Sequence, residues 1–298
     1  MSLWIGAGVA LVTPFKEGKI DYDALERLIE WQIGEGTDAL VMAGTTGESA
    51  TLTRDEKLEL FRFTLDIVKG RVPVIAGTGS NSTSDAISLS IDAEKLGVDG
   101  LLLVTPYYNK PSQRGLYAHY KAIANAVDLP IILYNVPGRT SVDLLPETVI
   151  ALSKIRNIEA LKEASGEPKR AELILSQVKE SFRVYSGNDN EIYDFMTMGA
   201  HGVISVLSNV MPKAVHELIY DYVEGRQGKA MESQRKYDKL IASLFIETNP
   251  VPAKEALNLM GYQAGEFRLP LVELEETNRD RLISVLEEYG LLEGGKSL

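Results

Sequence analysis

The amino-acid sequence predicts an α/β protein, a (β/α)8 TIM barrel with a C-terminal helical extension. Eight short apolar runs rich in β-branched residues alternate along the chain with eight stretches of helical length. Hydrophobicity within the runs is continuous rather than alternating, which indicates strands buried on both faces, as in a parallel sheet covered by helices. Eight strand–helix units within roughly the first 224 residues fit a barrel, because such folds usually take about 250 residues.

The expected elements follow one another in strict alternation. The strands are predicted at residues 9–12, 39–43, 73–77, 100–104, 130–134, 158–162, 183–186 and 202–206. Several of the helices begin behind Ser, Thr, Asp or Pro, which are common start signals. They are predicted at residues 21–34, 53–68, 82–96, 113–126, 146–153, 169–179, 190–198 and 212–224.

The segment after residue 224 predicts three further helices, at residues 229–245, 252–259 and 276–289. We therefore expect two domains, a catalytic barrel at 1–224 and a helical domain at 225–298. A doubly wound sheet is the weaker alternative. It would need a glycine-rich phosphate turn after the first strand, and Thr13, Pro14 and Phe15 do not form one.

Composition narrows the choice of partners. The formal net charge is -11, and no segment supplies the basic patch that nucleic acid or an anionic membrane surface would need. A small-molecule ligand is therefore expected. Residues 1–12 lack the features of a secretory signal, and no apolar run is long enough to span a bilayer. We expect a cytoplasmic protein.

Metal and thiol chemistry are not expected. The sequence contains no cysteine, which excludes disulfides, thiolate nucleophiles and iron–sulfur clusters. The three histidines, His119, His201 and His216, are scattered without the spacing of metal ligands.

Lys162 ends the predicted strand 158–162, and active sites of (β/α)8 barrels lie at the carboxyl ends of the strands. A lysine amine is protonated in water, with a pKa of about 10.4, but desolvation disfavours the charged form and can make the amine a Schiff-base nucleophile. Taken alone, Lys162 is better explained as a solubilising charge or as the partner of Glu163. Reactive groups at neighbouring strand ends favour the catalytic interpretation.

Residues 44–48, GTTGE, follow the second predicted strand. Their glycines would let backbone N–H groups approach a small carboxylate, and Thr45 and Thr46 add hydroxyl donors. A plain tight turn is the alternative. After the fifth strand, Arg139 carries the planar fork that suits two-point recognition of a carboxylate, although it could be a solvated loop charge.

Three tyrosines also follow predicted strands. Tyr134 could cap the core, yet a phenol near a lysine is also a plausible proton carrier. Tyr107 and Tyr108 are neighbours that cannot point the same way. One of them could serve the site while the other faces an interface or a second pocket, and ordinary packing over the barrel mouth is the alternative.

Several motifs together resemble the dihydrodipicolinate synthase family, over essentially the whole chain. They are VTPF at 12–15, GTTGE at 44–48, TPYYNKP at 105–111, YNVPGRT at 134–140, LKEASG at 161–166, NPVPAK at 249–254 and RLPL at 268–271. This family belongs to the pyruvate-dependent class I aldolases, which include N-acetylneuraminate lyase and the keto-deoxy sugar acid aldolases. The resemblance implies a lyase of lysine and diaminopimelate biosynthesis. Such an enzyme condenses pyruvate with L-aspartate-4-semialdehyde to give 4-hydroxy-tetrahydrodipicolinate, without metal or organic cofactor.

Residue by residue, the resemblance implies a Schiff base between Lys162 and pyruvate, and a hydroxyl relay of Tyr134, Thr45 and Tyr108. Tyr108 would enter the neighbouring subunit's site, so a tight dimer, usually paired into a homotetramer, is also implied. The positions that would bind the substrates or line the pocket are Thr46, Arg139, Gly187 and Ile204.

Family members inhibited by L-lysine bind it at positions that match Ser49, Ala50, Arg54, Lys57, Asn81, Asp85 and Tyr107. Asp85 is one methylene shorter than the usual glutamate, and Arg54 and Lys57 place cations where histidines are common. Two cations would oppose the ammonium groups of L-lysine, although they could instead hold its carboxylate. We therefore expect weak or absent feedback inhibition.

Two other functions compete with the synthase. A sugar-acid aldolase on the same scaffold would need a longer groove matched to hydroxyl groups, whereas Arg139 supplies a single carboxylate anchor. A non-catalytic metabolite-binding barrel would have no need of the lysine together with the whole hydroxyl relay.

Overall fold

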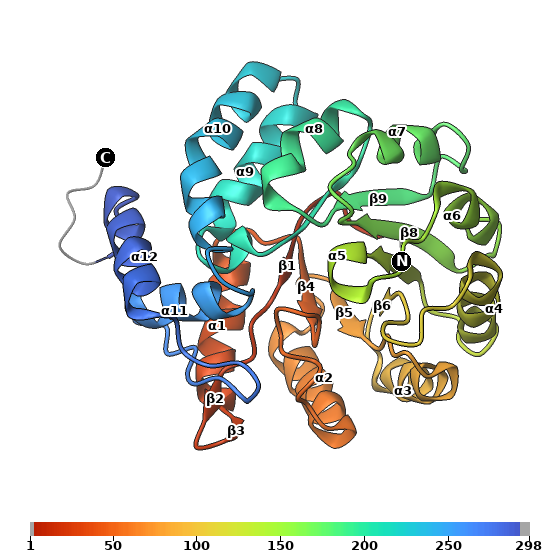
Figure 1. Ribbon diagram of the computed structural model, residues 1–298, viewed down its shortest axis with the longest axis horizontal. Coiled ribbons are helices and arrows are strands. Elements are labelled where there is room, and N and C mark those ends of the chain that lie inside the picture. The colour runs from red at the N-terminus through yellow and green to blue at the C-terminus, as the bar shows by residue number, and fades with distance from the viewer. Residues whose placement is uncertain (1–2, 293–298) are drawn as a thin grey trace.

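The computed structural model describes residues 3–292. Eight strands close into a barrel, in the order β1, β10, β9, β8, β7, β6, β5, β4 (Figure 1). All neighbouring strands are parallel, which confirms the predicted (β/α)8 barrel. The strands are β1 Gly6–Ala10, β4 Ala39–Met42, β5 Val74–Gly77, β6 Gly100–Val104, β7 Ile131–Asn135, β8 Ile158–Glu163, β9 Arg183–Ser186 and β10 Gly202–Ser205.

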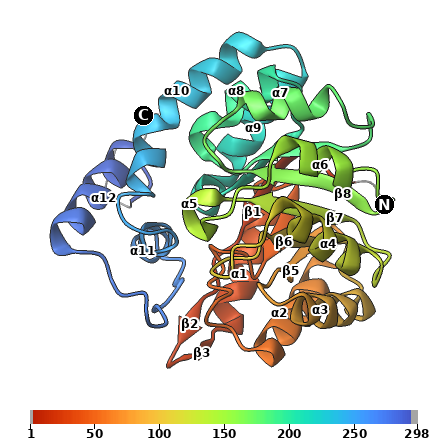
Figure 2. The same cartoon turned by 45° about the vertical axis from the view of Figure 1, so that its right-hand side comes forward.

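One layer of helices covers the outside of the barrel (Figures 1 and 2). Each predicted barrel helix is present, with ends that differ by a few residues. The helices are α1 Tyr22–Gly34, α2 Arg54–Val68, α3 Thr83–Leu96, α4 Gln113–Ala124, α6 Pro146–Leu152, α7 Lys169–Leu175, α8 Ile192–Thr197 and α9 Pro212–Val223.

Five short elements were not expected, because segments of two to four residues are too short to show a periodic pattern. They are the hairpin strands β2 Phe15–Lys16 and β3 Lys19–Ile20, the helix α5 Pro137–Thr140, and the 3-10 turns η1 Asp189–Glu191 and η2 Leu207–Asn209. Pro137 begins α5, where a proline needs no N–H partner. This single turn follows β7 directly and carries Arg139.

The C-terminal helices are α10 Gln227–Ser243, α11 Val251–Leu259 and α12 Glu276–Glu288. They lie on one side of the barrel, near α9 and α1 (Figures 1 and 2). Leu240, Leu257 and Leu282 belong to the same buried cluster as Leu28 and Val203 of the barrel. The division into two domains at residue 224 stays a prediction. Residues 1–2 of the first predicted domain and 293–298 of the second lie outside the described range. No helix within residues 3–292 is both long and apolar enough to cross a bilayer.

The interior of the barrel holds its own buried cluster, which includes Ile132, Tyr134, Ala160, Tyr185 and Ile204. Trp4 stacks on Tyr185, with ring centroids 4.5 Å apart, and accepts a hydrogen bond of 2.7 Å from the Tyr185 hydroxyl at its carbonyl oxygen. This aromatic pair fills one part of the barrel interior.

Closure between β1 and β10 depends on Gly202. Its φ of +142° is a region that residues with a side chain rarely adopt, and an added Cβ would overlap the carbonyl oxygen of Gly6 on β1. We predict that Gly202→Ala lowers the free energy of unfolding by about 3 kcal/mol in urea denaturation.

The matched control is Gly228→Ala, near the start of α10, where an added Cβ meets no atom within 4 Å. This control should leave stability unchanged or raise it by up to about 1 kcal/mol, because alanine is the better helix former. Equal stability of the two variants would show that the strand junction tolerates a side chain.

Candidate active site

Two adjoining cavities lie at the carboxyl ends of the barrel strands, with volumes of about 440 Å³ and 60 Å³. Residues from β6, β7 and the loops after β4 and β7 belong to both cavities. So does one residue between α10 and α11. The shared residues are Gly44, Thr45, Leu102, Tyr134, Val136, Arg139 and Asn249. The two cavities thus form one candidate site with a wide outer part and a narrow inner part.

Lys162 lines the inner cavity and is only 5% exposed. It is paired in register with Tyr134 on β7, and its Nζ lies 4.5 Å from the centroid of the Tyr134 ring. Glu163, the next residue, points to the other face of the strand, where its carboxylate accepts hydrogen bonds from Asn135 and Ser165. The alternative in which Lys162 pairs with Glu163 is therefore wrong.

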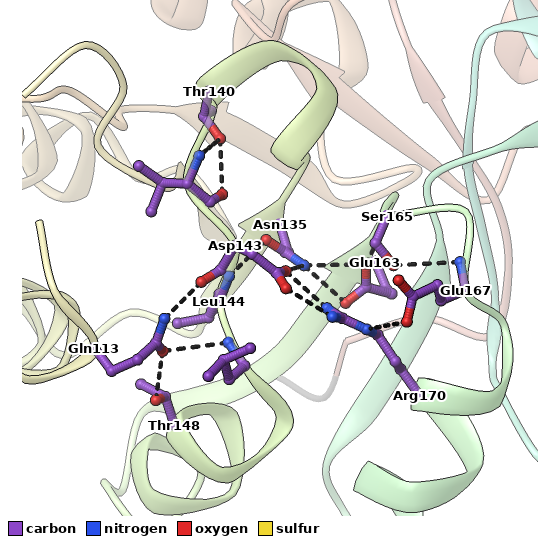
Figure 3. A network of polar contacts seen from close by, with 12 residues as sticks. Gln113, Asn135, Thr140, Asp143, Leu144, Thr148, Glu163, Ser165, Glu167 and Arg170 are labelled. Atoms are coloured by element: carbon purple, nitrogen blue, oxygen red, sulfur yellow. Dashed lines mark hydrogen bonds and ion pairs between the residues drawn. The ribbon is translucent and has the colours of Figure 1, made fainter. Parts of the chain in front are cut away.

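A polar network holds the outer face of β7 and β8 (Figure 3). Asn135 donates to Glu163 at 3.2 Å and to Asp143 at 3.0 Å. Arg170 makes a two-point ion pair with Asp143, at 2.7 and 2.6 Å. Burial raises the pKa of Glu163, while hydrogen bonds from Arg170 lower the pKa of Asp143. This network fixes the strand ends that present Lys162 and its tyrosine neighbour to the cavity.

Gly187 closes the inner cavity beside Lys162. Its N–H donates to the carbonyl oxygen of Glu163 at 2.7 Å, and an added Cβ would lie 3.1 Å from Cε of Lys162 and 2.6 Å from Cβ of Ala164. A side chain here would therefore displace the lysine. The resemblance to the synthase family named this position, and the structure gives a steric reason for glycine.

Asp189 ties the end of β9 to the end of β10. Its fully buried carboxylate accepts hydrogen bonds from the Ser205 hydroxyl at 2.5 Å and from the N–H groups of Val206 at 3.0 Å and Leu207 at 2.9 Å. Burial raises the pKa of Asp189. No local pattern in the sequence indicates this role, because the three donors come from the last residue of β10 and from the two residues after it.

The groups expected to bind carboxylates lie on one wall. Thr45 lines both cavities, and Thr46, 2% exposed, lines the inner one. Arg139 lines both cavities and donates a hydrogen bond of 3.2 Å to the carbonyl oxygen of Asn249. The Asn249 side chain in turn donates to the Thr46 hydroxyl at 2.9 Å. Sequence reasoning missed Asn249, which lies far along the chain from both.

Residues 3–292 contain no group of three His, Asp or Glu side chains arranged to hold a metal ion.

Comparison with known proteins shows which family the chain resembles. The model of the dihydrodipicolinate synthetase family matches residues 5–289. The chain belongs to this family.

Relatives cover the whole length of the chain. It is 49% identical to the 4-hydroxy-tetrahydrodipicolinate synthase of a Thermoanaerobacter species, over 98% of this chain and 99% of that protein. A synthase structure from Acinetobacter baumannii, described as chloride inhibited and complexed with pyruvate, matches with a TM-score of 0.95 at 44% identity, covering 97% and 100% of the two chains. A monomeric dihydrodipicolinate synthase variant matches with a TM-score of 0.95 at 47% identity, covering 97% and 98%.

Two residues implied by the resemblance to dihydrodipicolinate synthetases lie outside both cavities. Tyr108 is 88% exposed and has a φ of 69°, whereas its neighbour Tyr107 lines the outer cavity. Tyr108 therefore does not reach the site of its own chain. Ile204 is fully buried in the barrel interior and lines neither cavity. The roles of Tyr108 and Ile204 stay predictions.

Only some residues of the expected L-lysine site line a cavity. Four of them line the outer cavity: Ser49, Ala50, Lys57 and Tyr107. Burial lowers the pKa of Lys57. Arg54 instead turns to α3, where it hydrogen-bonds Ser88 and pairs with Asp92, while Asn81 and Asp85 line neither cavity. An inhibitory site at these residues stays a prediction.

A buried ion pair anchors the loop 44–48. Lys254 of α11 is fully buried and donates to Glu48 at 2.7 Å and to the carbonyl oxygen of Glu266 at 2.6 Å. Its Nζ also lies 4.5 Å from the centroid of the Phe15 ring. Glu48 has a φ of 53°, a strained conformation for a glutamate, and the ion pair helps to hold it there. The loop 44–48 is thus braced from the C-terminal helices.

We predict that Lys254→Met lowers the free energy of unfolding by about 3–5 kcal/mol, because it leaves the Glu48 carboxylate buried without its partner. Urea denaturation at neutral pH measures the change. The control is Lys239→Met, which removes an exposed ion pair with Glu288 and should cost at most about 1 kcal/mol. An equal loss of unfolding free energy in the two variants would show that burial does not increase the contribution of the Lys254–Glu48 pair to stability.

Proposed function

We propose that the protein is a lyase that condenses pyruvate with L-aspartate-4-semialdehyde to give 4-hydroxy-tetrahydrodipicolinate, a step of lysine and diaminopimelate biosynthesis. The observation that carries the proposal is the buried Lys162, held over the Tyr134 ring in the inner cavity. Arg139 and Thr46 on the adjoining wall can each hold a carboxylate. Family membership and relatives that carry the synthase name support the same reaction.

The reaction begins when Nζ of Lys162, once deprotonated, attacks the ketone carbon of pyruvate. Loss of one water molecule forms an iminium, whose positive charge acidifies the neighbouring methyl group. Thr45 and Thr46 hold the pyruvate carboxylate at the wall of the inner cavity. The narrow space around Lys162 suits a three-carbon acid, and the outer cavity stays free for the second substrate.

Loss of a methyl proton turns the iminium into an enamine, which attacks the aldehyde carbon of the semialdehyde. The aldehyde oxygen takes up a proton. The amine of the second substrate then attacks the iminium carbon, and Lys162 leaves as the ring closes. The two substrates thus yield the cyclic product and one water, with no net oxidation. Each step uses substrate carbonyls and the lysine amine, so the proposed mechanism calls for no metal or organic cofactor.

Tyr134 is the proposed proton carrier, because its ring lies directly against Lys162. Thr45, which lines both cavities with it, would extend the path outward. In this proposal Tyr108 completes the relay in the site of a neighbouring subunit, and its exposure on the single chain supports that role. We therefore propose a homo-oligomer built from tight dimers, with a tetramer as the expected form.

Cleavage of a sugar acid such as N-acetylneuraminate or 2-keto-3-deoxygluconate is the alternative for the same lysine. Arg139 favours the semialdehyde, because its guanidinium lies on the wall shared by both cavities and offers one carboxylate anchor. A non-catalytic metabolite-binding barrel would not need to form an imine. The Schiff base therefore separates the enzyme from the binding module, and substrate comparison separates the two enzymes.

We predict that pyruvate and sodium borohydride together add one reduced pyruvyl group to the wild type and none to Lys162→Ala, as measured by intact mass. A coupled assay should then show turnover with aspartate semialdehyde and none with N-acetylneuraminate. Folded wild type without an adduct would remove the Schiff-base mechanism. An adduct without turnover of the semialdehyde would favour another pyruvate aldolase.

We predict that Tyr134→Phe lowers kcat by about 10²–10⁴, the usual value of a general acid–base group, while the melting temperature stays close to that of the wild type. The matched control is Tyr185→Phe, since Tyr185 is the register neighbour of Lys162 on its other side. Its hydroxyl binds the Trp4 carbonyl, away from the site, so this variant should keep its kcat. Similar kcat values for the two variants would reject the proposed role of Tyr134.

A further inference from the structure

Asn135 is the last residue of β7 and is fully buried. Its side-chain oxygen accepts a hydrogen bond of 2.9 Å from the N–H of Leu144, 9 positions further along the chain. Its Nδ2 donates to the carboxylates of Asp143 at 3.0 Å and Glu163 at 3.2 Å. This one amide thus uses its acceptor and its donors within the network of Figure 3.

The contacts of Asn135 close the segment 136–143 into a loop. The segment leaves the barrel at Asn135 and comes back to the same side chain at Asp143 and Leu144. Between these points it forms the single turn α5, which carries Arg139. The Arg139 side chain lines both cavities. Both ends of the loop that presents the proposed carboxylate anchor are therefore tied to one buried amide.

The loop is also braced between its two ends. The Thr140 hydroxyl accepts from the N–H of Val142 at 3.2 Å and donates to the carbonyl oxygen of the same residue at 2.9 Å. The N–H of Arg139 donates to the carbonyl oxygen of Val136 at 2.9 Å. Because the loop is held together by its own hydrogen bonds, a shift at its ends would carry Arg139 with it.

The far end of the loop is held from two helices as well. Arg170 of α7 makes its two-point ion pair with the Asp143 carboxylate, and Gln113 of α4 donates to the Asp143 carbonyl oxygen at 2.6 Å. Asp143 is thus bound through its backbone and its side chain. The Asn135 amide connects this fixed end to the barrel.

The same amide reaches the strand that carries the lysine. Glu163 follows Lys162 on β8 and is paired in register with Asn135. The backbone holds this strand pair without the Asn135 side chain, because the N–H of Ala164 donates to the Asn135 carbonyl oxygen at 2.9 Å. Glu163 also keeps its hydrogen bond from the N–H of Ser165. Loss of the Asn135 side chain should therefore leave Lys162 in place and release mainly the loop.

We infer that Asn135 is a positioning residue that fixes Arg139 relative to Lys162. The inference rests on the proposed function and deepens it. In that reaction the enamine forms on Lys162 while Arg139 holds the carboxylate of the semialdehyde, so the spacing of these two residues decides whether the aldehyde carbon meets the enamine. A misplacement of about 1 Å can cost about 10²-fold in rate. Asn135 lines neither cavity and acts through Arg139.

The test measures kcat/KM for each substrate in Asn135→Leu, which keeps the approximate size of the side chain and removes its hydrogen bonds. The value for aspartate semialdehyde should fall about tenfold to a hundredfold. Imine formation precedes binding of the semialdehyde, so kcat/KM for pyruvate reports on Lys162 and not on Arg139. That value, and the yield of the borohydride adduct, should change less than about twofold.

The matched control is Asn157→Leu. Asn157 is a buried asparagine at the opposite end of β8, and its Nδ2 donates to the carbonyl oxygens of Ala124 and Val127. This variant should lower the melting temperature and leave kcat/KM for both substrates within about twofold of the wild type. An equal loss of kcat/KM for the semialdehyde in the two asparagine variants would overturn the inference.

A double-mutant cycle tests the route through Arg139. Arg139→Met removes the carboxylate anchor, so the position of the loop no longer matters to the semialdehyde. Adding Asn135→Leu to this variant should therefore lower kcat/KM for the semialdehyde by less than about twofold. The same tenfold or larger loss in both backgrounds would show that Asn135 acts by another path, against the inference.

Asp143→Ala keeps the inference testable if Asn135→Leu does not fold. It removes the partner of Asn135 and Arg170 at a side chain that is 33% exposed. The KM for aspartate semialdehyde should rise about threefold or more, with kcat/KM for pyruvate unchanged. A folded Asp143→Ala enzyme with the wild-type KM for the semialdehyde would count against the inference.

The outcomes distinguish the inference from the proposed function. A wild type that forms the pyruvate adduct but does not convert aspartate semialdehyde overturns the proposed function, and the inference with it. A wild type that converts it, with equal losses of kcat/KM for the two substrates in Asn135→Leu, overturns the inference alone.

Discussion

Closure of eight parallel strands into a barrel is the constraint on which the rest of the structure depends. Because all strands run the same way, every strand ends at the same rim. Side chains alternate between the two faces of a strand, so the barrel also decides which residues face the site. Lys162 points inward beside Tyr134, and Glu163 points outward to Asn135. A shift of one residue in the register of β8 would exchange the amine for the carboxylate.

Ion pairs outside the inner cavity support this arrangement. On one side, Arg170, Asp143 and Asn135 support the outer face of β7 and β8. On the other, Lys254 compensates Glu48 beneath the loop that offers the two threonines. A buried charge without a partner is expensive, so the fully buried Lys254–Glu48 pair strongly favours one arrangement of the chain around it. Lys162 lies between these two fixed points, which is how a scaffold holds a site to narrow tolerances.

The C-terminal helices complete the site as well as extending the barrel. Phe245 follows α10 and lines the inner cavity, Thr248 lines the outer one, and Asn249 lines both. Arg139 and Asn249, from opposite parts of the sequence, contact each other on the shared wall. The wall of the outer cavity is therefore built jointly by the barrel and the C-terminal segment, whereas Lys162 of the inner cavity comes from the barrel alone. The two parts also share one buried apolar cluster.

The sequence by itself determined the barrel, the order of its elements, and the strand-end positions of Lys162, Tyr134 and Arg139. Those features depend on local hydrophobic pattern and on motifs a few residues long, which can be read without knowing any distant contact. Only the tertiary structure decided that Asn249 joins Thr46 to Arg139, that Lys254 compensates Glu48, and how far Tyr108 is exposed on the single chain. The three contacts join residues more than a hundred positions apart, and the exposure of a side chain is a property of the packed chain. Neither leaves a periodic or short-range signal in the order of the residues.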